Sequence, residues 1–186
     1  DIPPDYQDTH IQTLFAYHNL NRPFDDYSQA PLLIGMCMDH RKRLRIPANF
    51  AFVIRTGGAN LRYNEFQVSY ALAVGGVDTI ALIGHNNCGM VNLFARKEQF
   101  VSGLIEKAGW QRELADDHFQ HFAPLFEIGN EVDFVKNEAV RLRARYPAAS
   151  NSGSRLHGRS YSDPKCCCWT SPPPISILPQ CGTSKN

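Results

Sequence analysis

The chain of 186 residues has little net charge and no long hydrophobic segment. No uninterrupted apolar run approaches the roughly 20 residues that span a bilayer, and no basic segment leads into an apolar one at the start, so we expect a soluble protein without a membrane partner. Because 19 Lys and Arg balance 18 Asp and Glu, the overall charge does not favour binding to nucleic acid. The short basic run from Arg41 to Arg45 is typical of a solvated loop. These absences favour chemistry on a small molecule.

The sequence also lacks the cysteine pattern of a disulfide-stabilised secreted domain. Of its six cysteines, Cys37 and Cys88 lie alone in the apolar part of the chain, and the other four crowd near its end, at 166–168 and 181. Disulfide frameworks are typical of small secreted domains that are short of core, and this chain is long enough to build a core without one. We therefore expect a reducing compartment, the cytoplasm.

One domain of ordinary size is the expectation for this length. The composition changes after Ala149, since the 36 residues from 151 to 186 include 15 Ser, Pro and Gly against four Leu and Ile. So few aliphatic side chains do not offset the entropy lost on ordering a segment. We expect one folded domain over 1–150, followed by an atypical, flexible tail rich in Ser, Pro and Cys over 151–186.

Short apolar runs alternate with helical patterns in the body of the chain. Residues 32–37, 51–54 and 79–83 have the continuous hydrophobicity of strands that a parallel sheet buries on both faces. Gly57 and Gly58 permit a turn after the second run. An apolar spacing that includes Phe66 and Tyr70 predicts a helix over 65–74, and a further helix is expected from about Val91.

The strongest helical pattern lies near the end of the body. Five apolar residues alternate spacings of three and four: Val132, Val135, Ala139, Leu142 and Tyr146. Asn130 is available as an N-cap, and Pro147 lies beyond the last turn. Helical patterns also cover 8–17 and 101–128, with the boundaries of the second left open. The alternation predicts an α/β fold with a mainly parallel sheet flanked by helices.

Two thiols and an imidazole follow the predicted strands. Cys37 ends the first strand, His85 follows the third, and Cys88 comes three residues later. Because the carboxyl ends of parallel strands form one edge of a sheet, where open α/β sheets bind ligands, we expect these side chains to converge. Zn²⁺ prefers such donors, and three protein ligands leave a fourth position for water or substrate. The pattern predicts a catalytic Zn²⁺ site, although His-x-x-Cys alone is also typical of a buried cysteine beside a helix-capping histidine.

Two charged residues accompany this set. Asp39 lies two residues after Cys37, and Arg41 lies two residues after Asp39, so both can lie near the metal and near each other. An arginine beside a carboxylate keeps it ionised and fixes its orientation. We expect Asp39 to accept a hydrogen bond from water or hydroxide on the zinc. His40 is a nearby candidate for passing the proton to solvent.

Three motifs in a fixed order give the sequence a family resemblance. They are Cys37-Met-Asp39-His-Arg41, then Arg55 with a Gly-rich turn ending in Asn60, then His85-Asn-Asn-Cys88-Gly89. The chain resembles the β-class carbonic anhydrases, whose pattern is C-x-D-x-R, R-x-x-G-N and H-x-x-C-G. By this resemblance Cys37, His85 and Cys88 bind zinc. Asp39 and Arg41 form the catalytic dyad.

The resemblance also implies an activity and an assembly. The expected enzyme is a zinc lyase that reversibly hydrates CO₂ to bicarbonate and a proton through attack of zinc-bound hydroxide. The expected architecture is a parallel sheet flanked by helices, in a homodimer or a multiple of dimers. CO₂ and bicarbonate are then the small-molecule partners, with no role for nucleic acid or membrane.

The sequence departs from the family pattern at several positions. Met38 and His40 stand where small hydroxyl residues are usual, and the turn after Arg55 has one extra residue. The next helix reads Gln67-Val-Ser-Tyr70, without the usual acidic residue, and the tail offers no equivalent of the family's last strand. Two alternatives stay open: hydrolysis of CS₂ or COS on the same zinc framework, and a zinc-stabilised scaffold without turnover.

Overall fold

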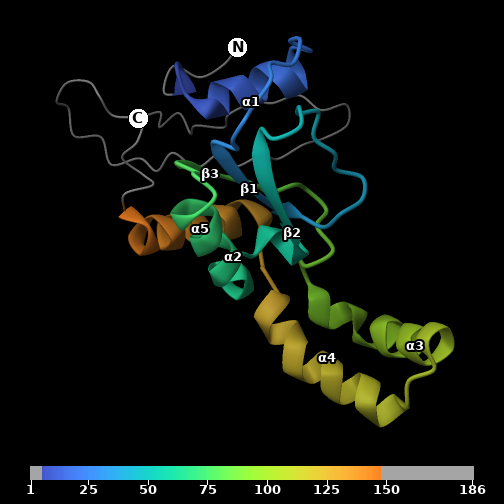
Figure 1. Ribbon diagram of the computed structural model, residues 1–186. Helices are drawn as coiled ribbons and strands as arrows, with labels where there is room; N and C mark the ends of the chain where they lie inside the picture. The colour runs from blue at the N-terminus through green and yellow to red at the C-terminus, as the bar shows by residue number, and fades with distance from the viewer. Residues whose placement is uncertain (1–5, 148–186) are drawn as a thin grey trace, which may run out of the picture.

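Three parallel strands form the centre of the computed structural model, which describes residues 6–147 (Figure 1). They are β1 (Leu32–Cys37), β2 (Ala51–Thr56) and β3 (Thr79–Ile83), in the order β2-β1-β3. In register, Leu32 of β1 lies opposite Ala51 and Thr79. All six residues of the central strand are buried, as expected for a parallel strand covered on both faces.

One face of the sheet is covered by α1 (His10–Asn19). Thr9 caps this helix, because its hydroxyl accepts from the amide of Gln12. The core on this side combines the apolar face of α1 with alternate residues of β1 and β3: Ile11, Leu14, Phe15, Tyr17, Leu32, Ile34, Met36, Ala81 and Ile83. Side chains alternate between the two faces of a strand, and those of residues 32, 34 and 36 in β1 pack against α1. The side chain of Cys37 therefore lies on the opposite face of the sheet, in the second core.

The other face of the sheet is covered by α2 (Glu65–Ala73) and α5 (Glu131–Arg145). The N-cap predicted at Asn130 is confirmed, because its side chain accepts from the amides of Val132 and Asp133. Short 3₁₀ turns at Gly57–Ala59 and Arg62–Asn64 lead from β2 into α2. Cys37 and Cys88 belong to the core on this side of the sheet.

A helical hairpin extends away from the body (Figure 1). It consists of the 3₁₀ turn Leu93–Arg96, α3 (Lys97–Ala108) and α4 (Arg112–Phe126), and it has a small core of its own. Gly109, with a φ of +69°, ends α3 in the left-handed conformation that lets the chain turn back. The ion pair between Lys97 and Asp116, at 2.8 Å, joins the two helices. Within residues 6–147 no helix combines the length and the hydrophobicity that crossing a bilayer requires.

The expected α/β fold with a parallel sheet flanked by helices is confirmed. Two local expectations are wrong. The run 51–54 is not buried on both faces, because β2 is an edge strand and its Phe52 is 39% exposed. No helix starts at Val91, because Asn92 adopts a left-handed φ of 54°, so that α3 begins only at Lys97. The tail predicted over 151–186 lies outside the described residues.

Candidate metal centre

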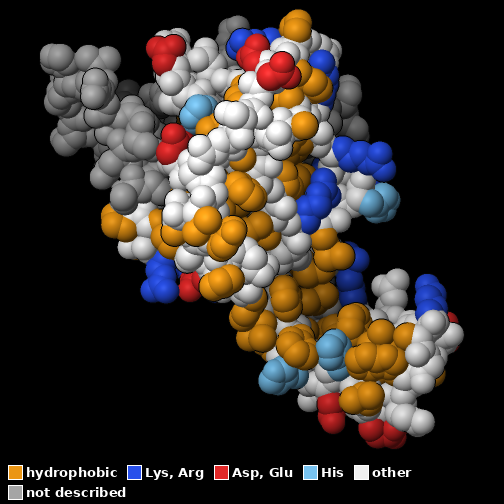
Figure 2. All heavy atoms as spheres, viewed as in Figure 1, with side chains coloured by type: hydrophobic (Ala, Val, Ile, Leu, Met, Phe, Trp, Pro, Cys, Tyr) orange, Lys and Arg blue, Asp and Glu red, His pale blue; other side chains and the backbone are white. Residues whose placement is uncertain are grey.

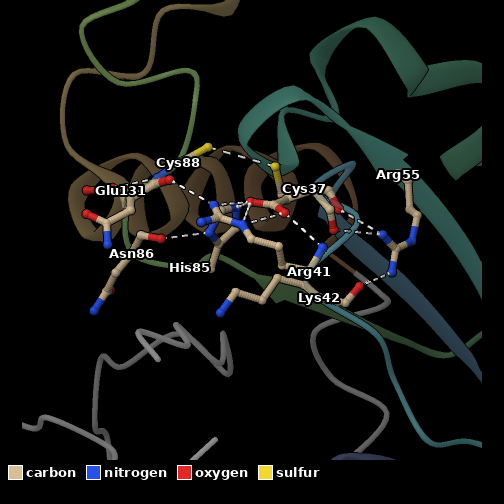
Figure 3. Close-up of polar contacts among 10 residues, drawn as sticks. Cys37, Arg41, Lys42, Arg55, His85, Asn86, Cys88 and Glu131 are labelled. Atoms are coloured by element: carbon tan, nitrogen blue, oxygen red, sulfur yellow. Dashed lines mark hydrogen bonds and ion pairs between the residues drawn. The ribbon is translucent and has the colours of Figure 1, made fainter. Parts of the chain in front are cut away.

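Cys37, His85 and Cys88 meet at the carboxyl edge of the sheet (Figure 3). Cys37 is the last residue of β1, His85 lies two residues after β3, and Cys88 follows in the next turn. All three are buried, their ligand atoms lie within 4.8 Å of one another, and the two sulfur atoms are 3.8 Å apart. Neighbouring parallel strands thus bring together residues that are 51 positions apart in the sequence. No second group of this kind occurs within residues 6–147.

The orientation of His85 suits a metal ligand. Its Nδ1 lies 2.9 Å from the carbonyl oxygen of Asn86, and because a carbonyl only accepts, Nδ1 carries the proton. Nε2 is then left with a lone pair, and it is buried without a hydrogen-bond partner. A buried polar atom without a partner is unusual. In metal sites a histidine commonly binds the ion through one nitrogen while the other donates to a carbonyl.

Backbone amides stabilise negative charge on the two sulfur atoms. The amides of Asp39 and Gly58 donate to Cys37, and the amide of Met90 donates to Cys88. The hydrogen bond from Cys88 is the largest contribution that lowers the pKa of Cys37, to about 4, while that same contact and burial raise the pKa of Cys88. The pair therefore holds one negative charge near neutral pH. Two sulfurs of this kind beside an unprotonated imidazole nitrogen fit Zn²⁺.

Asp39 and Arg41 form a close ion pair beside these three residues. The amide and Nε of Arg41 each donate to Asp39 Oδ1 at 2.9 Å, and Nη2 donates to Oδ2. This pairing with Arg41 holds the pKa of the Asp39 carboxyl well below its usual range. Asp39 Oδ2 lies 3.7 Å from His85 Nε2. The carboxylate is thus ionised, fixed in orientation and placed next to the candidate ligands.

Arg41 also links the two loops that carry the site. Its Nη2 donates to the carbonyl oxygen of Asn87 at 3.2 Å, so one guanidinium contacts both the loop after β1 and the loop after β3. Asn87 adopts a left-handed φ of 55°, a conformation that asparagine tolerates better than most residues. The structure therefore brings the five residues singled out in the sequence to one place.

Two residues at this site were missed by reasoning from the sequence. Glu131, the first residue of α5, accepts from the amide of Cys88 at 3.1 Å. Arg55 of β2 donates to carbonyl oxygens of the loop that carries Asp39. Arg55 belongs to one of the recognised motifs, which was the available signal, whereas nothing in the sequence marks Glu131. His40, the candidate for proton transfer, is exposed.

Comparison with solved structures supports the fold. The β-carbonic anhydrase isoform I of Trichomonas vaginalis is similar at 18% identity over 76% of this chain and 84% of that chain, with a TM-score of 0.50. Carbonic anhydrases of Glaciozyma antarctica and Streptococcus mutans match over the same shares at 18% and 17% identity, each with a TM-score of 0.47. No protein-family model and no curated protein matches. From the first of these likenesses and the topology above, the chain has the β-carbonic anhydrase fold.

Proposed function

We propose that the protein is a zinc enzyme that reversibly hydrates CO₂ to bicarbonate and a proton. The observation that carries the proposal is the convergence of Cys37, His85 and Cys88 beside an ion pair formed by Asp39 and Arg41. A structural zinc site normally has four protein ligands, whereas three leave one position open for chemistry. The presence of an oriented, ionised carboxylate next to three such residues favours catalysis over a structural role.

In this proposal Cys37 Sγ, His85 Nε2 and Cys88 Sγ hold the ion. When bound, Zn²⁺ supplies a nucleophile at neutral pH by lowering the pKa of water. The amides that donate to the sulfurs limit the charge that the thiolates place on the metal. Glu131 fixes the Cys88 backbone, so the third ligand is held from α5 as well as from its own turn.

Asp39 then acts on the attacking water as a hydrogen-bond acceptor. An ionised carboxylate only accepts, so Asp39 selects the orientation in which the oxygen lone pair is directed toward CO₂. Arg41 keeps Asp39 ionised and fixes the orientation of its carboxylate plane. Because both oxygens of Asp39 are engaged by Arg41, Asp39 is not assigned as a fourth ligand.

A CO₂ hydration assay on the zinc-loaded full chain tests this function, with CS₂ and COS as parallel substrates. We expect one zinc per chain by elemental analysis and hydration that Cys88→Ser abolishes together with the zinc. Turnover of CS₂ or COS without CO₂ hydration would assign the chain to the alternative hydrolase function. Bound zinc without turnover of any of these substrates would indicate that the zinc only stabilises the fold. If protein purified without chelator contained no zinc, the metal site would be refuted.

We further propose that the chain acts as a homodimer. Exposed apolar side chains form what we call the β2–α2 surface: Phe52, Tyr63, Phe66, Tyr70 and Val74, from 39% to 79% exposed. Figure 2 shows apolar side chains gathered over this part of the body. Since a Phe or Tyr side chain offers about 150–250 Å², the surface exposes roughly 500 Å² of apolar area. A standard interface buries about 800 Å² per partner, a little over half of it apolar.

We propose that a second copy of this chain covers the β2–α2 surface. Within residues 6–147, β2 is an edge strand of the sheet, and the outer edge of such a strand can pair with its own copy in antiparallel fashion about a two-fold axis. We therefore propose residues 1–150 as the catalytic domain of a homodimer or a multiple of dimers.

The compartment that we propose is the cytoplasm. The thiols of Cys37 and Cys88 must remain reduced to serve as metal ligands, and both are free in the structure.

A further inference from the structure

We propose that Arg55 is a positioning residue for Asp39, a role that rests on the proposed function. Arg55 lies on β2, opposite Met36 of β1, one residue before the strand pair ends at Cys37 and Thr56. Its side chain extends along the carboxyl edge of the sheet to the loop that follows Cys37 (Figure 3). This loop carries both members of the Asp39–Arg41 pair.

The guanidinium of Arg55 donates to three carbonyl oxygens, one at the end of β1 and two in that loop. Nη1 donates to the carbonyls of Cys37 at 3.4 Å and Asp39 at 3.3 Å, and Nη2 donates to the carbonyl of Lys42. These contacts extend from the end of β1 to the residue after Arg41. The backbone on both sides of the Asp39–Arg41 pair is therefore attached to one rigid side chain of the neighbouring strand.

Apart from Arg55, two side chains of the loop attach it to other segments: Arg41 donates to the carbonyl oxygen of Asn87, and Arg45 donates to the carbonyl oxygens of Tyr17 and Arg22. The amide of Met38 continues the sheet by donating to Thr56, and the amide of Lys42 donates back to Asp39, but the segment contains no helix or strand after Cys37. Carbonyls beyond a strand end need partners from elsewhere. Arginine suits this position because its planar group presents five donors in a fixed fork, whereas a lysine offers a single nitrogen.

Arg55 affects the proposed chemistry by holding the backbone of Asp39. Arg41 fixes the Asp39 carboxylate relative to the loop, and Arg55 fixes the loop relative to the strand that ends at Cys37. Together they place the carboxylate relative to the sulfur of Cys37. Without Arg55, the ion pair can still form and Arg41 still contacts Asn87, but the backbone on both sides of the pair loses its attachment to β2. A displacement of about 1 Å at a reacting centre can cost about 10²-fold in rate.

Hydrogen exchange of the loop amides tests the attachment without turnover. In zinc-loaded Arg55→Gln we expect the amides of Met38, Arg41 and Lys42 to exchange about tenfold faster or more, because local opening becomes easier. Arg43→Gln is the matched control. Arg43 lies in the same loop and is exposed, and its side chain makes no hydrogen bond or ion pair with residues 6–147, so its loss should leave the exchange unchanged. Unchanged exchange in Arg55→Gln would overturn the proposal, even if the enzyme proves active.

Kinetics test whether the attachment acts through Asp39. We expect Arg55→Gln to lower kcat by about 10- to 100-fold with zinc content retained, Arg55→Lys to fall in between, and Arg43→Gln to match the wild type. In the Asp39→Asn background the same Arg55→Gln change should cost less than about twofold, because coupled residues are not additive. Full additivity would overturn the positioning role. If the wild type did not hydrate CO₂, the proposed function would be refuted. The hydrogen-exchange experiment would then still decide whether Arg55 holds the loop.

Discussion

At the scale of single residues, the two thiols of the site share one charge when no metal is bound. Cys37 and Cys88 have sulfurs 3.8 Å apart in a buried place, so ionising both would put two negative charges side by side. Hydrogen bonds from Cys88 and from two backbone amides favour the charge on Cys37. Zinc-free protein should therefore contain one stable thiolate rather than two ordinary thiols.

Titration of the thiolate absorbance checks this prediction. In zinc-free protein whose cysteines at 166–168 and 181 are changed to serine, we expect one thiolate at neutral pH that is lost as the pH falls toward about 4. Because this folded-state pKa lies below the ordinary 9.0, ionisation of Cys37 stabilises the fold fully above pH 9, and the contribution disappears as the pH falls through about 4. Cys37→Ser should remove the signal, and a titration near the ordinary thiol pKa would contradict the prediction.

Asp39→Asn tests the carboxylate at almost constant volume. The amide keeps one acceptor oxygen but loses the charge that pairs with Arg41. We expect CO₂ hydration to fall about 10²-fold, the usual cost of one oriented electrostatic contact, with zinc content unchanged. Asp117→Asn, at an exposed carboxylate on α4, is the control and should have wild-type activity. Wild-type activity in Asp39→Asn would remove the main reason for preferring an enzyme over a scaffold.

The residues that we propose carry the chemistry could be picked out from the sequence, because the types and spacing of such residues are constrained. Cys37, His85, Cys88, Asp39 and Arg41 are brought together as expected. The contacts that hold them in place were not predictable, although Arg55 itself stands in one of the three motifs. Arg55 and Glu131 act on backbone groups of distant segments, and such contacts impose no local pattern on the sequence.

At the scale of elements, α5 is joined to the loop before α2 by a buried carboxylate. Glu138 is fully buried and accepts from the amide of Leu61, from Arg62 and from Arg141. Glu138→Ala should lower the free energy of unfolding by about 3 kcal/mol, because it leaves Arg141 and a buried amide without their partner. Chemical denaturation of the zinc-loaded protein measures this.

The control for this change is an ion pair on the hairpin. Glu98 pairs with Arg112 at 2.6 Å, with side chains 72% and 54% exposed. Glu98→Ala should cost less than about 1 kcal/mol, since exposed pairs contribute little. Equal losses in the two variants would mean that burial of Glu138 adds nothing to the stability.

Element boundaries were predictable where local signals agreed. Over 131–145 the apolar spacing, the Asn130 cap and the following Pro147 all indicate one helix, and the structure has it. The start of α3 was not predictable, because the left-handed Asn92 and the contacts of Glu127 with the amides of Asn92 and Leu93 depend on the packed hairpin. The exposure of β2 likewise depends on strand order, which hydrophobicity does not encode.

At the scale of the whole molecule, α2 has apolar side chains on two sides, one facing the core and one exposed. The spacing of Phe66, Tyr70 and Val74 correctly predicted a helix, yet these side chains are 79%, 52% and 65% exposed, while Val68 and Ala71 face the core. A single chain therefore leaves one apolar side of α2 uncovered. Exposed apolar patches of several hundred Å² usually mark an interface.

Phe66→Asp tests whether a second copy covers this surface. Because Phe66 is mostly exposed in the single chain, the change should leave the fold intact but place a charge in the interface. A central aromatic residue contributes about 2 kcal/mol or more, and two-fold symmetry places it in the interface twice, so we expect the dimer to dissociate about 10³-fold more readily. Sedimentation across a concentration series measures this.

The control variant is Leu20→Asp, which should remain dimeric. Leu20 follows α1 on the other side of the sheet, and its side chain is 66% exposed. A wild type that sediments as a monomer at every concentration, or a Phe66→Asp variant as dimeric as Leu20→Asp, would show that the β2–α2 surface is not where two copies meet.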